Sequence, residues 1–209
     1  MESHLKAGIA IYNDGYYHAA HDAWEEYWLS LESGSNDEKF LHGLIQFTAA
    51  VHHGYNQNWE GTKGLAESSR DYLADLPESY RNVNVEDIRQ YLRTLASDPE
   101  YIERTKPLKI SFKENKLQPI DLSADSIFIA AEVFAEEFDY DSAIIDQAIE
   151  FAKSDLSNNN ESSVFISLLF DFVCEPEQRS LVFQRLTEHV HERKYRENDV
   201  KGLFDASEE

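Results

Sequence analysis

Cysteine is nearly absent from this chain, whose 209 residues include only Cys174. A single cysteine cannot form an internal disulfide, and it has no second thiol with which to build a cysteine-based metal site. The sequence therefore excludes the class of secreted proteins that internal disulfides stabilise. Its cysteine content fits a reducing compartment best.

Long apolar runs are also missing, as is an N-terminal leader that combines basic residues, an apolar stretch and a cleavage site. A membrane-spanning helix needs about twenty consecutive apolar residues, and a signal peptide needs all three of those parts. The sequence therefore predicts a cytoplasmic protein that does not enter a membrane.

Basic residues are scarce relative to acidic ones: 19 Lys and Arg stand against 40 Asp and Glu, for a formal net charge of −21. Nucleic acids and anionic membranes both require a basic surface, so we expect neither as a partner. Aromatic residues make up 12% of the chain, which argues against disorder. A folded, carboxylate-covered surface is typical of halophiles, because molar salt screens charge repulsion over about 3 Å. We expect a halophilic protein.

Apolar residues recur with helical periodicity along most of the sequence, so the predicted fold class is all-α. We expect a multi-helix bundle with a short β-hairpin or extended connector between two helical parts. Asn84, Ser123 and Asp141 are predicted N-caps, and Pro176 is the predicted first residue of the last helix. The predicted helices are 5–12, 16–31, 37–54, 59–74, 85–97, 124–138, 142–153, 163–173 and 176–195.

The periodicity changes between residues 104 and 121. Leu108, Ile110 and Phe112 alternate with polar residues there, and five basic residues fall in the same stretch. This pattern predicts a short hairpin or an extended linker. The expected parts are a helical core (1–103), a basic linker or hairpin (104–121) and an acidic helical bundle (122–209).

Two segments near the N-terminus carry the residues that could support chemistry: HDAWEEYW (21–28) and FLHGLIQFTAAVHH (40–53). On a helix, positions three, four and seven apart share a face. One stripe therefore contains His21, Trp24, Glu25 and Trp28, and the other contains Gly43, Gln46, Ala50 and His53. If the two helices lie side by side, both stripes line one aromatic-walled pocket.

The same segments, within GIAIYNDGYYHAAHDAWEEYW and FLHGLIQFTAAVHHGYNQNWEGTKGLAE, resemble the domain of unknown function 309 family. That family shares a His-acid-x-x-Glu-x-x-Trp segment and a Gly-Leu-Ile-Gln segment that ends in histidine and is followed by Asn and Gly. The resemblance covers about residues 5–75 and implies an all-helical fold with a site of undescribed purpose. Asp22 stands where glutamate is more usual, and Ala19 where another glutamate is expected. The matched positions are Gly15, His21, Glu25, Trp28, Gly43, Leu44, Ile45, Gln46, Ala50, His53, Asn58 and Gly61.

One interpretation is a metal or small-ligand site. His21 and Glu25 can reach one ion from a single helix, and His53 would complete a set of two histidines and one carboxylate, as in zinc and iron sites. The same three residues are the candidate catalytic groups, with Glu25 as general base. Trp24, Trp28 and Gln46 are the candidate ligand-binding residues. A divalent metal is the candidate cofactor, but the HExxH signature is absent and no reaction follows from the sequence.

Two non-catalytic interpretations compete with it. In the first, His21, Glu25, Gln46 and His53 form a buried hydrogen-bond network that fixes the register of the helices. In the second, the aromatic helical hairpin binds a protein partner or a second copy of the chain, because aromatic side chains dominate binding energy. Whether the protein is an enzyme stays open at this point.

Overall fold

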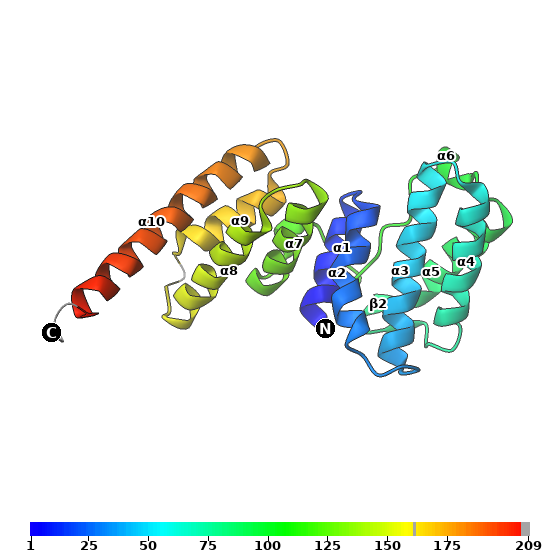
Figure 1. The fold of residues 1–209 in the computed structure, drawn as a ribbon. Helices are drawn as coiled ribbons and strands as arrows, with labels where there is room; N and C mark the ends of the chain where they lie inside the picture. The colour runs from blue at the N-terminus through cyan, green and yellow to red at the C-terminus, as the bar shows by residue number, and fades with distance from the viewer. Residues whose placement is uncertain (161, 206–209) are drawn as a thin grey trace. The chain divides into compact units, whose positions relative to one another are not determined.

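The computed structural model describes residues 1–160 and 162–205, with side chains up to residue 199. Within these residues the chain forms ten α-helices and one two-stranded antiparallel sheet, which confirms the predicted all-α fold class (Figure 1). The helices are α1 (Glu2–Asn13), α2 (Tyr17–Leu29), α3 (Asn36–Tyr55), α4 (Trp59–Leu73), α5 (Val85–Ser97), α6 (Tyr101–Arg104), α7 (Ala124–Glu137), α8 (Ser142–Ser157), α9 (Val164–Cys174) and α10 (Arg179–Asp205).

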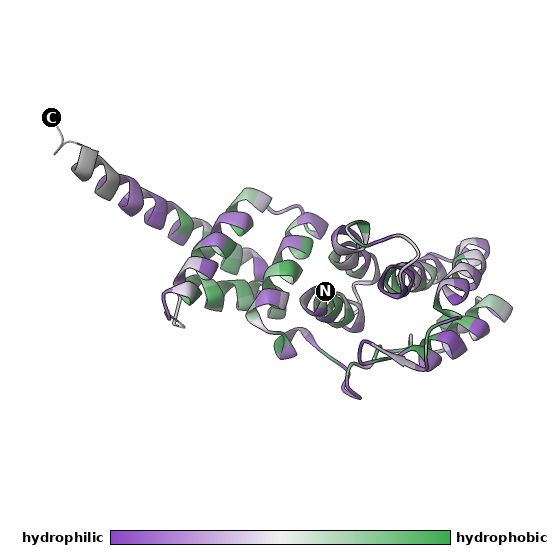
Figure 2. Cartoon of the chain, turned by 90° about the horizontal axis from the view of Figure 1, so that it is seen from below, coloured by the Kyte–Doolittle hydropathy of each residue, from purple (hydrophilic) through white to green (hydrophobic). Residues whose placement is uncertain are grey.

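The chain divides into two compact units, Met1–Ala130 and a second unit that begins at Ala131, so the boundary lies within α7. In the first unit the helices pack in chain order: α1 on α2, α2 on α3, α3 on α4 and α4 on α5 (Figure 1). In the second unit α8, α9 and α10 pack against one another. Most helices carry both hydrophilic and hydrophobic residues, as amphipathic packing requires (Figure 2). No helix in the described part of the chain is long and apolar enough to cross a membrane.

Side-chain caps explain where several helices begin. The side chains of Asn84, Asp141 and Ser163 accept hydrogen bonds from the backbone amides at the starts of α5, α8 and α9, at 3.1, 3.0 and 3.2 Å. The predicted caps Asn84 and Asp141 are confirmed, while Ser163, predicted as the first residue of its helix, is the cap that precedes it. The last helix begins at Arg179, three residues later than predicted, because Pro176 lies in a turn before it.

The sheet is a small hairpin that the sequence did not predict. Its strands, β1 (Ser79–Tyr80) and β2 (Val83–Asn84), are joined by Arg81 and Asn82. These two residues have φ of 50° and 66°, the left-handed conformations that a two-residue type I′ hairpin turn requires. The stretch predicted as a short hairpin or an extended linker is mainly an extended connector, as the second alternative has it, with one tight turn closed by a 2.7 Å bond from Phe112 N to Asn115 O.

Close approaches between helices organise the core of the first unit. Trp24 is fully buried against Gly8 of α1, where a Cβ would lie 2.2 Å from the indole Nε1. Gly43 brings α3 equally close to Leu73 of α4, since a Cβ there would lie 2.5 Å from a Leu73 methyl carbon. Ser69 Oγ donates to the Gly43 carbonyl across the same contact, at 2.7 Å.

The second unit is organised around one buried cation. Arg179 is 5% exposed, and its guanidinium carbon lies 4.5 Å from the ring centres of both Phe134 and Phe138. Its Nε donates to the Phe172 carbonyl at 2.9 Å, at the end of α9. Arg179 therefore joins the end of α7, the end of α9 and the start of α10.

Candidate functional site

One face of α2 carries four side chains that could bind a metal. His18, His21, Asp22 and Glu25 occupy positions i, i+3, i+4 and i+7, so they form a single stripe along the helix. The sequence analysis selected His21 and Glu25 from this stripe and did not select His18. The helix that carries this stripe packs on α3, which carries the second predicted segment (Figure 1).

His21 is the centre of the group. Its Nε2 lies 3.8 Å from Glu25 Oε1, and its Nδ1 lies 3.9 Å from Asp22 Oδ1. One ligand atom from each of the three residues falls within 4.8 Å of the other two. Ligand atoms around a tetrahedral zinc ion are roughly 3.3–3.5 Å apart, because each bond is about 2.0–2.1 Å long. Small side-chain rotations would therefore bring these three groups to the spacing of metal ligands.

Asp22 lies between two imidazoles. Its Oδ2 is 3.8 Å from Nδ1 of His18, while its other oxygen faces His21. The ring of His18 lies 5.4 Å from that of His52 on α3, and His52 lies 6.2 Å from His53, measured between ring centroids. The imidazoles of the two helices thus meet, but the contact runs through His18 and His52 rather than directly from His21 to His53.

The predicted residues Trp28 and Gln46 gather around His42. The His42 ring stacks on Tyr72 of α4 with centroids 3.8 Å apart, and Trp28 lies 4.6 Å away. His42 Nδ1 is 3.4 Å from Glu38 Oε1, and its Nε2 is 3.5 Å from the amide nitrogen of Gln46. This half-buried cluster joins residues of α2, α3 and α4.

Glu38 is held in its ionised form by that cluster. The Trp28 indole donates to Oε1 at 3.0 Å, and the Gly34 amide donates to Oε2 at 3.3 Å. Burial by itself raises the pKa of Glu38, but the hydrogen bonds from Trp28, Gly34 and His42 outweigh burial and hold the pKa below its usual value. The carboxylate therefore orients both the indole and the imidazole.

His53 belongs to a different arrangement, at the junction of α3 and α4. Its Nδ1 lies 2.8 Å from Asn58 Nδ2, and Asn58 Oδ1 accepts from the Gly61 amide at 3.0 Å. A Cβ on Gly61 would lie 2.7 Å from Asn58 Nδ2, so a larger residue here would displace the side-chain amide that contacts His53. In the described residues His53 is not part of the ligand group around His21, and its predicted place beside His21 and Glu25 has no support from this geometry.

Trp24 and Trp28 have different environments. Trp24 is 0% exposed and donates to the Leu5 carbonyl at 3.4 Å, so its surroundings are those of a core residue. Trp28 is partly exposed. Gln46 and His53 have separate partners, His42 and Asn58, so the hydrogen bonds of the described residues do not join the four predicted polar residues into one network.

Sequence reasoning missed His18 and His42. His18 could have been found from its spacing, because it is on the same stripe as His21, Asp22 and Glu25. The surroundings of His42 could not, since the ring that stacks on it is Tyr72, from the next helix.

The first unit is thus an all-helical fold with a His, Asp and Glu group on one helix and a His-centred aromatic cluster on the neighbouring helices. Residues 5–65 match the model of a family described as "Domain of unknown function (DUF309)", which confirms the resemblance found in the sequence. The matched segment includes most of α1, all of α2 and α3 and the beginning of α4, and therefore the whole stripe on α2.

A search of curated proteins found a similar "Uncharacterized protein" of Aquifex aeolicus (strain VF5). The two are 27% identical over 112 residues, which is 54% of this chain. The aligned region is 33% of the relative, so the match spans about a third of that longer protein. This similarity carries no activity over to the present chain.

Proposed function

We propose that the first unit binds a divalent transition-metal ion through His21, Asp22 and Glu25. The observation that supports this most strongly is that one imidazole and two carboxylates from a single helix stripe offer ligand atoms within 4.8 Å of one another. Imidazole and carboxylate together suit zinc, iron and manganese, and two carboxylates balance the charge of a divalent ion.

The site would be open to solvent. The side chains of His21, Asp22 and Glu25 are 31%, 32% and 45% exposed, and three protein ligands leave at least one coordination position for water or a small molecule. An open position distinguishes a site that can act on a ligand from a closed structural site. The role of Glu25 as a general base stays a prediction.

His18 would act from outside the ligand set. Its ring faces the Asp22 oxygen that is turned away from His21, at 3.8 Å. A partner of this kind orients a ligating carboxylate, and its loss commonly weakens metal affinity about 10–100-fold. We therefore assign His18 to positioning Asp22.

Calorimetric titration of the full chain with Zn²⁺, together with elemental analysis, tests the proposal. We expect one equivalent of metal, a loss of affinity of more than about 100-fold in His21→Ala and in Glu25→Gln, and a smaller loss in His18→Ala. His53→Ala is the matched control, because this histidine is on the neighbouring helix and bonded to Asn58; its zinc affinity should stay unchanged.

Thermal unfolding of each variant shows whether the fold is kept. An equal loss of zinc affinity in His53→Ala and His21→Ala would contradict the assignment of ligands. Absence of stoichiometric zinc from the wild-type protein, combined with a lower melting temperature for His21→Ala, would show that the group is structural.

A further inference from the structure

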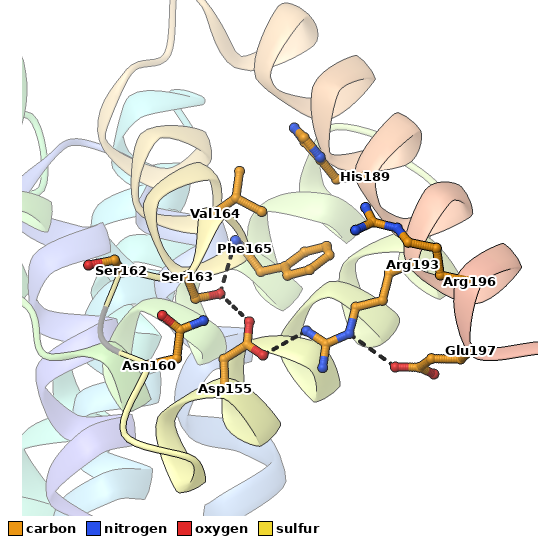
Figure 3. Close-up of a pocket in the computed structure, with 10 residues that line it drawn as sticks. All are labelled: Asp155, Asn160, Ser162, Ser163, Val164, Phe165, His189, Arg193, Arg196 and Glu197. Carbon is orange, nitrogen blue, oxygen red and sulfur yellow. Dashed lines mark hydrogen bonds and ion pairs between the residues drawn. The ribbon is translucent and has the colours of Figure 1, made fainter. Parts of the chain in front are cut away.

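The second unit contains a cavity of about 760 Å³ between the end of α8, the loop that precedes α9, the first turn of α9, and α10 (Figure 3). Ligand pockets in proteins have volumes of about 300–1,000 Å³. Since a water molecule occupies about 30 Å³ in the liquid, an inorganic ion would fill only a small part of this one. The size fits an organic molecule.

The carboxylates at this cavity already have donors. Asp155 accepts from Ser163 Oγ at 2.6 Å through Oδ2 and from Arg193 Nη1 at 2.8 Å through Oδ1. Arg193 also donates from Nε to Glu197 at 3.1 Å. Figure 3 shows these bonds as one connected chain. Asp155 and Glu197 are therefore engaged with protein donors and are poorly placed to receive a cationic ligand.

Arg193 is fixed by packing as well as by these bonds. Its guanidinium carbon lies 4.4 Å from the ring centre of Phe151 and 5.5 Å from that of Phe165, and its side chain is 24% exposed. The arginine is thus a rigid wall of the cavity that needs no rearrangement when a ligand enters.

Donors at the mouth are less engaged. The side chain of Arg196 is 72% exposed and is held only loosely by Glu192 of its own helix, at 3.5 Å. Its guanidinium points toward the space beside Phe165 (Figure 3). On the opposite wall, Val164 begins α9 at a position where a helix amide has no acceptor within its own helix. Both groups favour an anion.

Apolar surface adjoins these donors. Val164 is 40% exposed, which is unusual for valine in a folded protein, while Phe165 beside it lines the cavity but is only 4% exposed in all. An anionic group alone would leave this surface in contact with water. A ligand that also carries an apolar body would cover it.

We infer that this cavity binds a small organic anion, with a carboxylate, sulfonate or phosphate group held by Arg196 and the first turn of α9, and a flat apolar body on Val164 and Phe165. The inference is independent of the metal proposal, because its residues belong to the second unit. The experiment that tests this inference is therefore separate from the one that tests the metal site.

Fluorescence titration of the full chain with 8-anilinonaphthalene-1-sulfonate tests it, because this probe joins a sulfonate to a flat aromatic body. We expect saturable binding at one site. N-phenyl-1-naphthylamine, the same body without the sulfonate, should bind at least about 10-fold more weakly, the discrimination that one charge-assisted contact provides. Competition by benzoate and by phenyl phosphate then shows which anionic group is preferred.

Arg196→Gln should weaken probe binding about 10-fold, since it removes the positive charge at the mouth. Arg185→Gln is the matched control: Arg185 is exposed on the same helix and does not line the cavity. Val164→Asp, at a partly exposed position, should abolish binding while the helical circular dichroism is kept. Equal effects of Arg196→Gln and Arg185→Gln, equal affinity for the uncharged probe, or non-saturating fluorescence would each overturn the inference.

Discussion

The side-chain amide of Asn13 and the backbone of Ile110 form hydrogen bonds in both directions, across 97 residues of sequence. Asn13 Nδ2 donates to the Ile110 carbonyl at 2.9 Å, and its Oδ1 accepts from the Ile110 amide at 2.8 Å. The same Nδ2 donates to the Leu117 carbonyl at 3.0 Å. Because Asn13 is only 5% exposed, the extended connector is fastened to the end of α1 by one buried side chain.

Asn13→Ala should destabilise the protein by roughly 2–4 kcal/mol, because it leaves a buried amide and buried carbonyls of the connector without partners. Urea denaturation of both proteins measures the difference. Asn115→Ala is the control: Asn115 is in the same connector, but its side chain makes one exposed bond of 3.3 Å to Lys113. The control should change stability by less than about 0.5 kcal/mol. Equal losses of stability in Asn13→Ala and Asn115→Ala would show that the buried hydrogen bonds of Asn13 do not stabilise the fold.

Gly8 and Gly64 give a matched pair of glycine-to-alanine substitutions with opposite expected signs. Both are in helices, but a Cβ on Gly8 would collide with Trp24 at 2.2 Å, whereas a Cβ on Gly64 would meet nothing within 4 Å. Gly8→Ala should destabilise by about 1–3 kcal/mol through overpacking. Gly64→Ala should stabilise by about 0.5–1 kcal/mol, since alanine restricts the unfolded chain and favours helix. Melting temperatures that shift in the same direction would contradict the packing argument.

Asp37 should make stability depend on pH in the acid range. Arg81 donates to both carboxylate oxygens, at 2.8 and 2.5 Å, and Tyr80 donates its hydroxyl at 2.7 Å. These bonds hold the pKa of Asp37 below its usual value, and the hydrogen bonding by Arg81 has the largest effect. An aspartate with a lowered pKa stabilises the fold above the unfolded-state pKa of about 3.9 and loses that contribution as the pH falls through its folded-state pKa.

Asp37→Asn should therefore cost about 1 kcal/mol or less near neutral pH, where the exposure of Arg81 weakens the ion pair, and nothing once the pH is below both pKa values. Urea denaturation of wild type and variant across this range gives the two curves. They should converge at low pH. A constant difference at every pH would mean that the carboxylate charge is not responsible.

The stability of the protein should keep rising with salt up to concentrations far above those of ordinary buffers. With 40 acidic and 19 basic residues, carboxylates repel one another across the surface, and screening shortens that repulsion to about 3 Å at 1 M. We expect the melting temperature to rise with potassium chloride into the molar range. A melting temperature equally high in dilute buffer would contradict the halophilic interpretation.

Local chemistry allowed much of the fold to be predicted. Asn84 and Asp141 begin helices because a short polar side chain satisfies amides a few residues ahead, and that information lies within a single turn of sequence. The hairpin at residues 79–84 was missed because Arg81 and Asn82 form its turn, where Asn-Gly or Asp-Gly is the usual signal.

The candidate site was predicted only in part, for a related reason. Spacing along one helix brought His21 and Glu25 together correctly, at 3.8 Å. Spacing cannot show which neighbour a side chain selects, and His53 is bonded to Asn58, five residues ahead, rather than to a residue of α2. The contact between His42 and Tyr72 depends on how α4 returns along α3, which no local pattern specifies.

The buried Arg179 has a consequence for how the second unit comes apart. Its guanidinium lies over Phe134 and Phe138 while it bonds the Phe172 carbonyl, so separating α7, α9 or α10 from the other two breaks a contact of this buried side chain. Loss of the packing of any one of these helices should therefore destabilise the other two, which makes thermal unfolding of this unit an all-or-none event.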